Sequence, residues 1–369
     1  MSRQLQAIII DDAATYRKVL NMVLEGIDGI EVIGEFQNGK VGLIGIQQLQ
    51  PDLVLLDVEM PEMNGLQVLE VVKRDFPDIG VIMVSGADRK HADITVKALQ
   101  MGAIDFVPKP YESSIEENVE LLKRKLTPLI HVYSTRKNLE KIKKINDRMS
   151  SEARKQEVSD RPVVRKEDKK VLSYRIELVA IGTSTGGPYA LGELIPQLPA
   201  DFPVPILIVQ HMPPNFTASL ANSLSKKSKI SVKEAQEGDV LEPGKAYIAP
   251  GGHHMVIKRE VSAKDKIVLG LEDSLPQHGC RPSVDVLFKS IANKFRGNVL
   301  SVVMTGMGAD GTEGVRTMKN GNCYCLIQDE ASCVVFGMPK VVYENKLADE
   351  VWPLSDLARR ITDLTKFGK

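Results

Sequence analysis

The sequence has few of the residues that mark a secreted, disulfide-bonded or membrane-embedded protein. Its 369 residues include four cysteines and one tryptophan, and aromatic residues make up 5% of the chain. No apolar run is long enough to span a bilayer, and residues 1–6 lack the basic start and apolar stretch of a secretory signal. We therefore expect a cytoplasmic protein without direct membrane insertion.

The cysteines and the charge distribution exclude further classes of protein. The cysteines all lie in the last third of the chain, at Cys280, Cys323, Cys325 and Cys333. In a reducing compartment we expect small core residues rather than a disulfide framework, and Cys323-x-Cys325 lacks the second pair that a zinc site needs. The 48 basic residues balance 48 acidic ones. The basic stretch 128–174 lacks the folded context of a nucleic-acid surface, so we expect no nucleic-acid partner.

The length of the chain suggests two or three domains, and residues 1–127 have the pattern of one of them. Five apolar strands alternate with five amphipathic helices. The expected strands are Ala7–Ile10, Ile30–Glu35, Leu53–Leu56, Val81–Val84 and Ala103–Val107, and the expected helices are Thr15–Glu25, Val41–Leu49, Leu66–Arg74, Lys90–Met101 and Glu112–Leu126. Strict alternation predicts an α/β domain with a parallel sheet covered on both faces, and such sheets bind ligands beyond the carboxyl ends of their strands.

Polar side chains follow the expected strands of this first domain. Asp11 and Asp12 follow the first strand, Asp57 the third, Ser85 the fourth and Lys109 the fifth. Three carboxylates at one edge repel one another unless a cation joins them, and an all-oxygen ligand set favours Mg²⁺. Ser85 and Lys109 can then bind a phosphoryl group on Asp57. All five residues occur in the order that such a site requires. This argues against the alternative that each is merely a polar residue at the end of a strand.

Residues 1–127 resemble a response-regulator receiver domain. The matching stretches are Ile8–Asp12, Leu55–Gly65 and Val107–Pro110. The resemblance implies a flavodoxin-like doubly wound fold, phosphorylation of Asp57 by a histidine kinase, and a need for Mg²⁺. The Mg²⁺ ligands that it implies are Asp12, Asp57 and the backbone carbonyl of Glu59, with Asp11 assisting through water. The switch residues that it implies are Ser85, Phe106 and Lys109.

Residues 128–174 are expected to form a charged, flexible linker. Pro128 is predicted to interrupt any continuous helix, because it lacks an N–H donor and its ring clashes with the preceding turn. A short apolar face between residues 139 and 145 indicates some helix within the linker. Ser150–Lys170 has the composition of a disordered tether.

Apolar strands and glycine turns resume beyond Tyr174. Ile176–Ile181 is a predicted buried strand, followed by the turn Gly182–Gly187 and a helix that opens at Pro188. Glycines around Ser184 permit a sharp turn that aims backbone N–H groups and a helix N-terminus at one point, as a nucleophile elbow requires. A phosphate cradle, or a tight turn without chemistry, explains the same residues.

Two further strands end in residues that could act with Ser184. Pro205–Gln210 ends at His211, and Leu300–Met304 leads through a glycine-rich turn to Asp310. The three strand ends would place a nucleophile, a base and a carboxylate on one edge of a sheet, which is the arrangement of a catalytic triad.

Each member of this set has an alternative explanation. A single histidine is more often structural than catalytic, and His253, His254 and His278 are rivals of His211. Asp310 could be a turn residue held by local hydrogen bonds. The order Ser, His, Asp differs from that of the α/β-hydrolases, so the elbow pattern does not indicate that fold.

Residues 175–369 resemble the catalytic domain of the chemotaxis protein-glutamate methylesterases, the CheB family. The matching stretches are Ile181–Gly187, Gln210–Pro214, Ala249–Gly251, Arg281–Asp285, Thr305–Gly311 and Glu330–Pro339. The resemblance implies a second doubly wound, Rossmann-like parallel sheet. It also implies that Ser184 is the nucleophile, that His211 is the general base and that Asp310 orients it. The implied oxyanion donors are backbone N–H groups at Thr185 and Met307.

The two resemblances together imply a phosphorylation-activated serine esterase of chemotactic adaptation. It would hydrolyse glutamate γ-methyl esters on the cytoplasmic part of methyl-accepting chemoreceptors and deamidate receptor glutamines, with no cofactor for the esterase reaction. A chemotaxis histidine kinase would phosphorylate Asp57, and the unphosphorylated receiver would block the edge that carries Ser184.

A receiver-regulated nucleotide- or DNA-binding output protein is the alternative function. A DNA-binding output needs a basic recognition helix, whereas the second domain is nearly neutral and far larger than a helix-turn-helix module. A nucleotide site at Gly182–Gly187 needs a P-loop lysine or a Gly-x-Gly-x-x-Gly pattern with a following acid, and neither is present.

Overall fold

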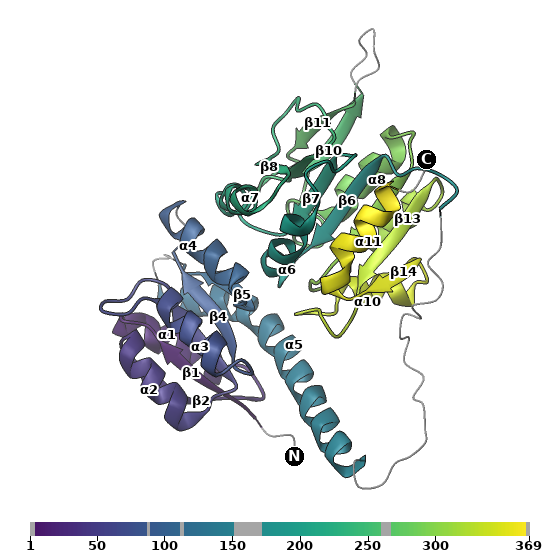
Figure 1. Ribbon diagram of the computed structural model, residues 1–369. Helices are drawn as coiled ribbons and strands as arrows, with labels where there is room; N and C mark the ends of the chain where they lie inside the picture. The colour runs from purple at the N-terminus through teal and green to yellow at the C-terminus, as the bar shows by residue number, and fades with distance from the viewer. Residues whose placement is uncertain (1–3, 87–88, 111–113, 151–171, 260–266, 367–369) are drawn as a thin grey trace. The chain divides into compact units, whose positions relative to one another are not determined.

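The computed structural model describes residues 4–86, 89–110, 114–150, 172–259 and 267–366 of the chain. They form two compact units, and each is built around its own parallel β-sheet (Figure 1). We call the unit with the five-stranded sheet the first unit and the unit with the seven-stranded sheet the second unit. No helix in these ranges has both the length and the apolar character needed to cross a membrane.

The five-stranded sheet of the first unit has the order β2-β1-β3-β4-β5. Its strands are β1 (Leu5–Ile10), β2 (Ile30–Phe36), β3 (Leu53–Asp57), β4 (Gly80–Ser85) and β5 (Asp105–Pro108). Every neighbouring pair is parallel. The strands β3 and β4 are buried throughout, as unbroken apolar runs predict for a sheet covered on both faces. The predicted strands and their parallel pairing are confirmed.

Each strand of the first unit is followed by a helix. The helices that follow these strands along the chain are α1 (Ala14–Glu25), α2 (Gly39–Leu49), α3 (Gly65–Asp75), α4 (Arg89–Gln100) and α5 (Ile115–Ser150), of which α4 groups with the residues of the second unit. The sheet order places β2 on one side of β1 and β3 on the other. The direction of winding therefore reverses between β1 and β3, and sheets of this kind bind ligands beyond the carboxyl ends of the strands at such a reversal.

Helix α5 differs from its prediction. It runs from Ile115 to Ser150 with Pro128 inside it, so the predicted interruption at Pro128 is wrong. Leu126 and Ile130 beside the proline are 0% and 1% exposed. A proline in a helix interior costs about 3 kcal/mol, whereas burial of each of these two side chains contributes roughly 1.5–3 kcal/mol. Packing therefore outweighs the local cost. The tether expected over Ser150–Lys170 lies, beyond its first residue, outside the described residues.

The seven-stranded sheet of the second unit has the order β14-β13-β12-β6-β7-β9-β8. Its strands are β6 (Leu178–Thr183), β7 (Ile206–Gln210), β8 (Ser231–Glu234), β9 (Lys245–Ile248), β12 (Val299–Val303), β13 (Cys323–Gln328) and β14 (Glu350–Trp352). Every neighbouring pair is parallel. The chain winds from β6 to β7 and later returns to β12 on the other side of β6. The predicted second doubly wound sheet is confirmed, and its winding reverses at β6.

Helices and a small hairpin complete the second unit. The helices are α6 (Gly187–Leu194), the 3₁₀ turn η1 (Ile195–Gln197), α7 (Phe216–Lys227), α8 (Val284–Lys294), α9 (Thr312–Met318), α10 (Met338–Glu344) and α11 (Leu354–Lys366). The strands β10 (His254–Arg259) and β11 (Ile267–Glu272) pair antiparallel. Helix α8 packs against β10 and contributes Val284 and Phe288 to a core that includes Leu178 and Val209 of the sheet.

A nearly buried ion pair fastens helix α11 to the edge strand β14. Arg360 Nε and Nη2 donate to the two carboxylate oxygens of Glu350, and Tyr324 and Trp352 also donate to that carboxylate. Burial acts to raise the pKa of Glu350, but the hydrogen bonds from Arg360, Tyr324 and Trp352 hold that pKa below its usual value. The carboxylate is therefore ionised and fully bonded at neutral pH.

Replacing Arg360 with Leu should destabilise the second unit by about 3–5 kcal/mol, because Glu350 keeps its charge in a nearly buried site without its partner. Urea unfolding followed by the fluorescence of Trp352, the one tryptophan of the chain, measures the change. The contribution of Glu350 should be present above its unfolded pKa of about 4.3 and be lost as the pH falls through its lower folded pKa. An unchanged urea midpoint in Arg360→Leu at pH 7 would contradict this account.

Candidate functional site

The acidic residues predicted at the edge of the first unit lie together. Asp11, Asp12 and Asp57 each offer a carboxylate oxygen, and these atoms lie within 4.8 Å of one another. Lys109 Nζ lies 2.8 Å from Asp11 Oδ2 and 2.8 Å from Asp57 Oδ2. Asp11 and Asp57 are buried, whereas Asp12 is exposed. The cluster stands at the reversal between β1 and β3.

The electrostatics of this cluster fit a cation. Burial raises the pKa of Asp57 to about 6, against the lowering effect of Lys109 and with the charge of Asp11 adding to the rise. Asp11 Oδ2 is buried and receives no hydrogen bond of good geometry, although Lys109 lies beside it. Oxygen ligands with one exposed, water-accessible member are the donor set that Mg²⁺ prefers. The residues present therefore fit Mg²⁺.

The remaining residues expected here occupy neighbouring positions. Ser85 ends β4, is fully buried, and donates its hydroxyl to the carbonyl of Gly86 at 3.2 Å. Phe106 lies in β5, partly exposed, and pairs in register with Met83. Glu59 is exposed in the loop that follows β3. Ser85 thus stands beside the acidic cluster, and Phe106 stands on the adjacent strand.

In the second unit, Ser184 sits in a tightly bonded turn between β6 and α6. Its N–H donates to the carbonyl of Thr305 at 3.0 Å, and its own carbonyl accepts the N–H of Gly187 at 2.8 Å. Gly186 has φ of +78°, a left-handed conformation that favours glycine. The hydroxyl of Ser184 has no hydrogen-bond partner among the described residues, and the side chain is partly exposed. The backbone is fixed, and the hydroxyl is available.

His211 follows β7 at the position next to Ser184. The last register pair of the two strands is Thr183 with Gln210, and the N–H of His211 donates to the carbonyl of Thr183 at 3.2 Å. Because side chains alternate along a strand, Ser184 and His211 both continue the face of the sheet that packs on α8. The imidazole Nε2 lies 2.8 Å from Asp310 Oδ2.

Asp310 is held at the N-terminus of helix α8. Its carboxylate is 1% exposed and accepts the hydroxyl of Ser283 at 2.9 Å. It also accepts backbone N–H groups of Val284 at 2.7 Å, Asp285 at 2.9 Å and Gly311 at 2.9 Å. A helix N-terminus carries partial positive charge, so α8 stabilises the buried anion that in turn binds His211.

The two partners shift each other's ionisation. Burial alone would lower the pKa of His211, but side-chain hydrogen bonds with Asp310 and with Cys280 raise it to about 9. Burial acts to raise the pKa of Asp310, but His211 and the amides of Asp285 and Val284 hold it below its usual value. Each partner therefore stabilises the charged form of the other.

Three strand ends therefore meet where the second sheet reverses. Ser184 follows β6, His211 follows β7, and Asp310 lies in the loop between β12 and α9. His211 and Asp310 are in direct contact. Ser184 and His211 lie on neighbouring strand ends, and no hydrogen bond joins their side chains in the described part of the chain. Catalytic hydrogen bonds are often long or absent in unliganded sites and shorten only when substrate binds.

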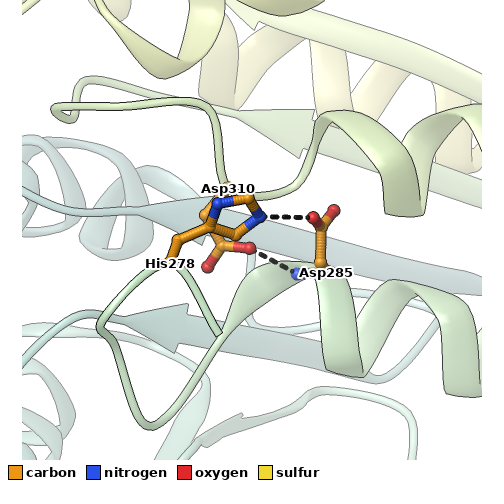
Figure 2. A group of neighbouring side chains, drawn as sticks. All are labelled: His278, Asp285 and Asp310. Atoms are coloured by element: carbon orange, nitrogen blue, oxygen red, sulfur yellow. Dashed lines mark hydrogen bonds and ion pairs between the residues drawn. The ribbon is translucent and has the colours of Figure 1, made fainter. Parts of the chain in front are cut away.

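The rival histidines have other structural partners. His254 is fully buried, accepts the N–H of Ser283 at Nδ1 and approaches the carbonyl of Leu275 with Nε2. His253 pairs with Asp273 at the exposed surface. His278 Nε2 lies 3.1 Å from Asp285 Oδ2, and Figure 2 draws this pair. Of the four, only His211 lies beside the Ser184 turn and binds Asp310.

His278, Asp285 and Asp310 form a group whose ligand atoms lie within 4.8 Å of one another (Figure 2). The group does not fit a cation. Both oxygens of Asp310 already accept hydrogen bonds, and Asp285 accepts the N–H of Gly314 at 2.7 Å as well as pairing with His278. The amides that donate to Asp310 belong to a helix N-terminus, which attracts anions and repels cations.

The two residues implied as oxyanion donors flank the Ser184 turn. Thr185 follows Ser184 and is buried, and its carbonyl accepts the hydroxyl of Thr305 at 2.9 Å. Met307 lies in the loop after β12, partly exposed, and its N–H has no acceptor within the described ranges. A backbone N–H group at such an edge, such as that of Met307, can stabilise negative charge that develops on a substrate.

Several residues that build the site were not singled out from their sequence context. Gln210 donates to the carbonyls of Ser184 and His211, Ser283 supports Asp310, and Cys280 contacts His211. Ser283 had a readable signal, because a serine with an acid two residues later is a common helix start. Neither Gln210 nor Cys280 carries such a signal, since their contacts arise only in the folded sheet.

Two family models match the chain, that of the response regulator receiver domain over residues 7–120 and that of CheB methylesterase over residues 179–361. A protein-glutamate methylesterase/protein-glutamine glutaminase of Desulfotalea psychrophila is 43% identical over 369 residues, covering 99% of both chains. That of Trichodesmium erythraeum is 41% identical over 355 residues, 96% of this chain and 97% of the relative. The crystal structure of the Thermotoga maritima CheB methylesterase catalytic domain is 41% identical and covers 51% of this chain and 98% of its own, with a TM-score of 0.49.

The imidazole of His211 should titrate at about pH 9 in the folded protein, and Asp310→Asn should lower that value because the carboxylate is removed. Since the folded pKa is raised, the pair stabilises the fold fully below about pH 6.5 and loses that effect as the pH rises through about 9. An NMR titration of the ¹⁵N-labelled imidazole measures the pKa. A His211 pKa that is identical in wild type and Asp310→Asn would contradict the assignment.

Proposed function

The chain belongs to the CheB methylesterase family, and from this premise we propose that it is a phosphorylation-activated serine esterase of chemotactic adaptation. It hydrolyses glutamate γ-methyl esters on chemoreceptors and deamidates receptor glutamines. The proposal assigns residues 1–127 to the receiver, 128–174 to a linker and 175–369 to the catalytic domain. The observation that carries it is the contact of His211 with Asp310 at the position next to Ser184.

In the acylation step, Ser184 Oγ attacks the γ-carbonyl carbon of the methylated glutamate. Asp310 binds His211 at Nε2, so neutral His211 holds its proton there and Nδ1 is the nitrogen that takes the proton of Ser184. The bond to the methoxy oxygen then breaks. Methanol leaves with the proton that Nδ1 returns, and the glutamyl group remains as an ester on Ser184.

Deacylation repeats these transfers with water as the nucleophile. His211 Nδ1 removes a proton from water, the oxygen of water attacks the acyl carbon, and Ser184 leaves with the proton restored. The product is a receptor glutamate. A glutamine side chain follows the same route with ammonia as the leaving group, so one site accounts for both activities.

Two sets of charges are stabilised during these steps. Asp310 favours the imidazolium form of His211 that arises in each transition state, and its bonds to α8 keep it ionised in a buried position. The N–H groups of Met307 and Thr185 are the proposed donors to the oxyanion. Loss of one such donor typically costs roughly 3–4 kcal/mol of transition-state stabilisation.

The receiver controls this site through Asp57. We assign Asp57 as the phospho-acceptor, with the phosphoryl group supplied by a chemotaxis histidine kinase. Asp12, Asp57 and the carbonyl of Glu59 would hold Mg²⁺, assisted by Asp11 through water, and the bound ion supplies positive charge that offsets the phosphoryl oxygens.

Three further residues form the proposed switch. Lys109 Nζ lies 2.8 Å from Asp57 Oδ2, where it can pair with a phosphoryl oxygen, and Ser85 at the end of β4 can add a hydrogen bond. Phe106 lies on the adjacent strand β5 and is the proposed aromatic residue that reports phosphorylation. Phosphorylation of Asp57 would then expose the sheet edge that carries Ser184.

Methanol release from methylated chemoreceptor membranes tests the function. Ser184→Ala and His211→Ala should each lower kcat by about 10⁴-fold or more, because nucleophile and base act as one unit. Asp57→Ala should keep the basal rate and lose only the increase that a small-molecule phosphodonor produces in wild type.

The three variants separate the catalytic claim from the regulatory claim. Methanol release by Ser184→Ala at the wild-type rate would exclude the esterase mechanism. Stimulation of Asp57→Ala by the phosphodonor to the wild-type extent would exclude Asp57 as the acceptor and leave the catalytic assignment intact.

A further inference from the structure

Gln210, the last residue of β7, joins the backbones of Ser184 and His211. Its side-chain Nε2 donates to the carbonyl oxygen of Ser184 at 2.9 Å and to the carbonyl oxygen of His211 at 3.2 Å. The residue is 2% exposed. One buried amide therefore ties the chain at the proposed nucleophile to the chain at the proposed base.

The regular pairing of β6 with β7 does not extend to Ser184 and His211. The ladder between β6 and β7 ends at the pair Thr183 and Gln210, and the N–H of His211 makes one more bond to Thr183. Beyond these residues the chain turns into α6 on one side and enters a loop on the other. The amide of Gln210 supplies the next cross-link, at the residues whose separation determines proton transfer.

The side chain of Gln210 lies on the face of the sheet away from the reacting groups. A Cβ atom on Gly187 would lie 1.9 Å from Gln210 Oε1 and 2.5 Å from Thr183 Oγ1, so both side chains pack directly under the first turn of α6. Ser184 and His211 continue the opposite face, next to α8. Gln210 can thus act on catalysis only through the two backbones that it binds.

The amide oxygen of Gln210 indicates that the two hydrogen bonds donated by Nε2 are the reason for a glutamine at this position. Gln210 Oε1 is buried and has no hydrogen-bond partner in the described part of the chain. A buried acceptor without a partner lowers stability, and an apolar side chain of the same size would avoid that loss. The amide is therefore explained by what its Nε2 donates.

We propose that Gln210 is a positioning residue that sets the separation of Ser184 and His211. The inference rests on the proposed function, since it concerns the rate of the same hydrolysis. Removing the amide donors removes the cross-link beyond the last ladder bond, so the chain at Ser184 can move relative to the chain at His211 while substrate contacts stay in place. Because a displacement of about 1 Å can lower a rate about 10²-fold, kcat should fall and KM should change little.

The test compares wild type, Gln210→Met and Gln210→Asn as full-length chains. Gln210→Met keeps the volume and removes both donated bonds, and Gln210→Asn keeps an amide on a side chain one carbon too short to reach both carbonyls. Active sites are counted by complete labelling of Ser184 with a fluorophosphonate, and kcat for methanol release is expressed per labelled site. Ser301→Ala serves as a matched control, because Ser301 is a fully buried polar residue of β12 whose hydrogen bonds go to Cys323 and Tyr324.

We expect kcat per labelled site to fall by about 10- to 100-fold in both Gln210 variants with KM within about threefold of wild type, and to stay within about twofold in Ser301→Ala. A purely structural role would reduce the number of labelled sites or the melting temperature and leave kcat per site unchanged, which would overturn the inference. If Gln210→Met does not fold, Gln210→Asn decides on the same criterion. A wild-type protein that releases no methanol would instead reject the proposed function, so the two failures are distinguishable.

Discussion

The buried carboxylate of Asp310 is the constraint on which the second unit depends. An ionised carboxylate in the interior is tolerated only when its oxygens are bonded, and here a serine hydroxyl, three backbone amides and an imidazole bond it. Meeting that requirement fixes the start of α8, the loop after β12 and the ring of His211 in one arrangement. The bond at Nε2 leaves Nδ1 of His211 as the nitrogen that we propose for proton transfer with Ser184. The chemistry proposed for this edge follows from how one negative charge is buried.

In both units the proposed site lies where the sheet reverses its winding. The buried carboxylates at the two sites are stabilised in different ways. Each sheet reverses its winding beside one strand, at β1 in the first unit and at β6 in the second, and each proposed site lies beyond the carboxyl ends there. In the first unit Lys109 pairs with Asp11 and Asp57, and these two acids together with Asp12 form a donor set that fits a metal ion. In the second unit a helix N-terminus and an imidazole surround the acid, and the group beside it does not fit a cation.

Residues that follow strands could be found from the sequence, and residues that act across strands could not. Asp57, Ser184 and His211 each follow an apolar run, so their place at a sheet edge was predictable from the chain alone. The path of α5 through Pro128 was not, because buried contacts of Leu126 and Ile130 offset a local penalty that the sequence displays. The contacts of Gln210 could not be predicted from the sequence either, since its partners are backbone carbonyls on two different strand ends. Motifs locate reactive groups, whereas the folded sheet determines what holds them in place.

The central claim is that Ser184 and His211 act as one catalytic unit, and the most direct test is a double-mutant cycle on kcat/KM for receptor demethylation. Wild type, Ser184→Ala, His211→Ala and the double variant are measured under identical conditions. The account predicts that the double variant is no slower than the slower single variant, because either substitution already disables the unit. Losses that multiply in the double variant would show that the two residues act independently, and would contradict the account.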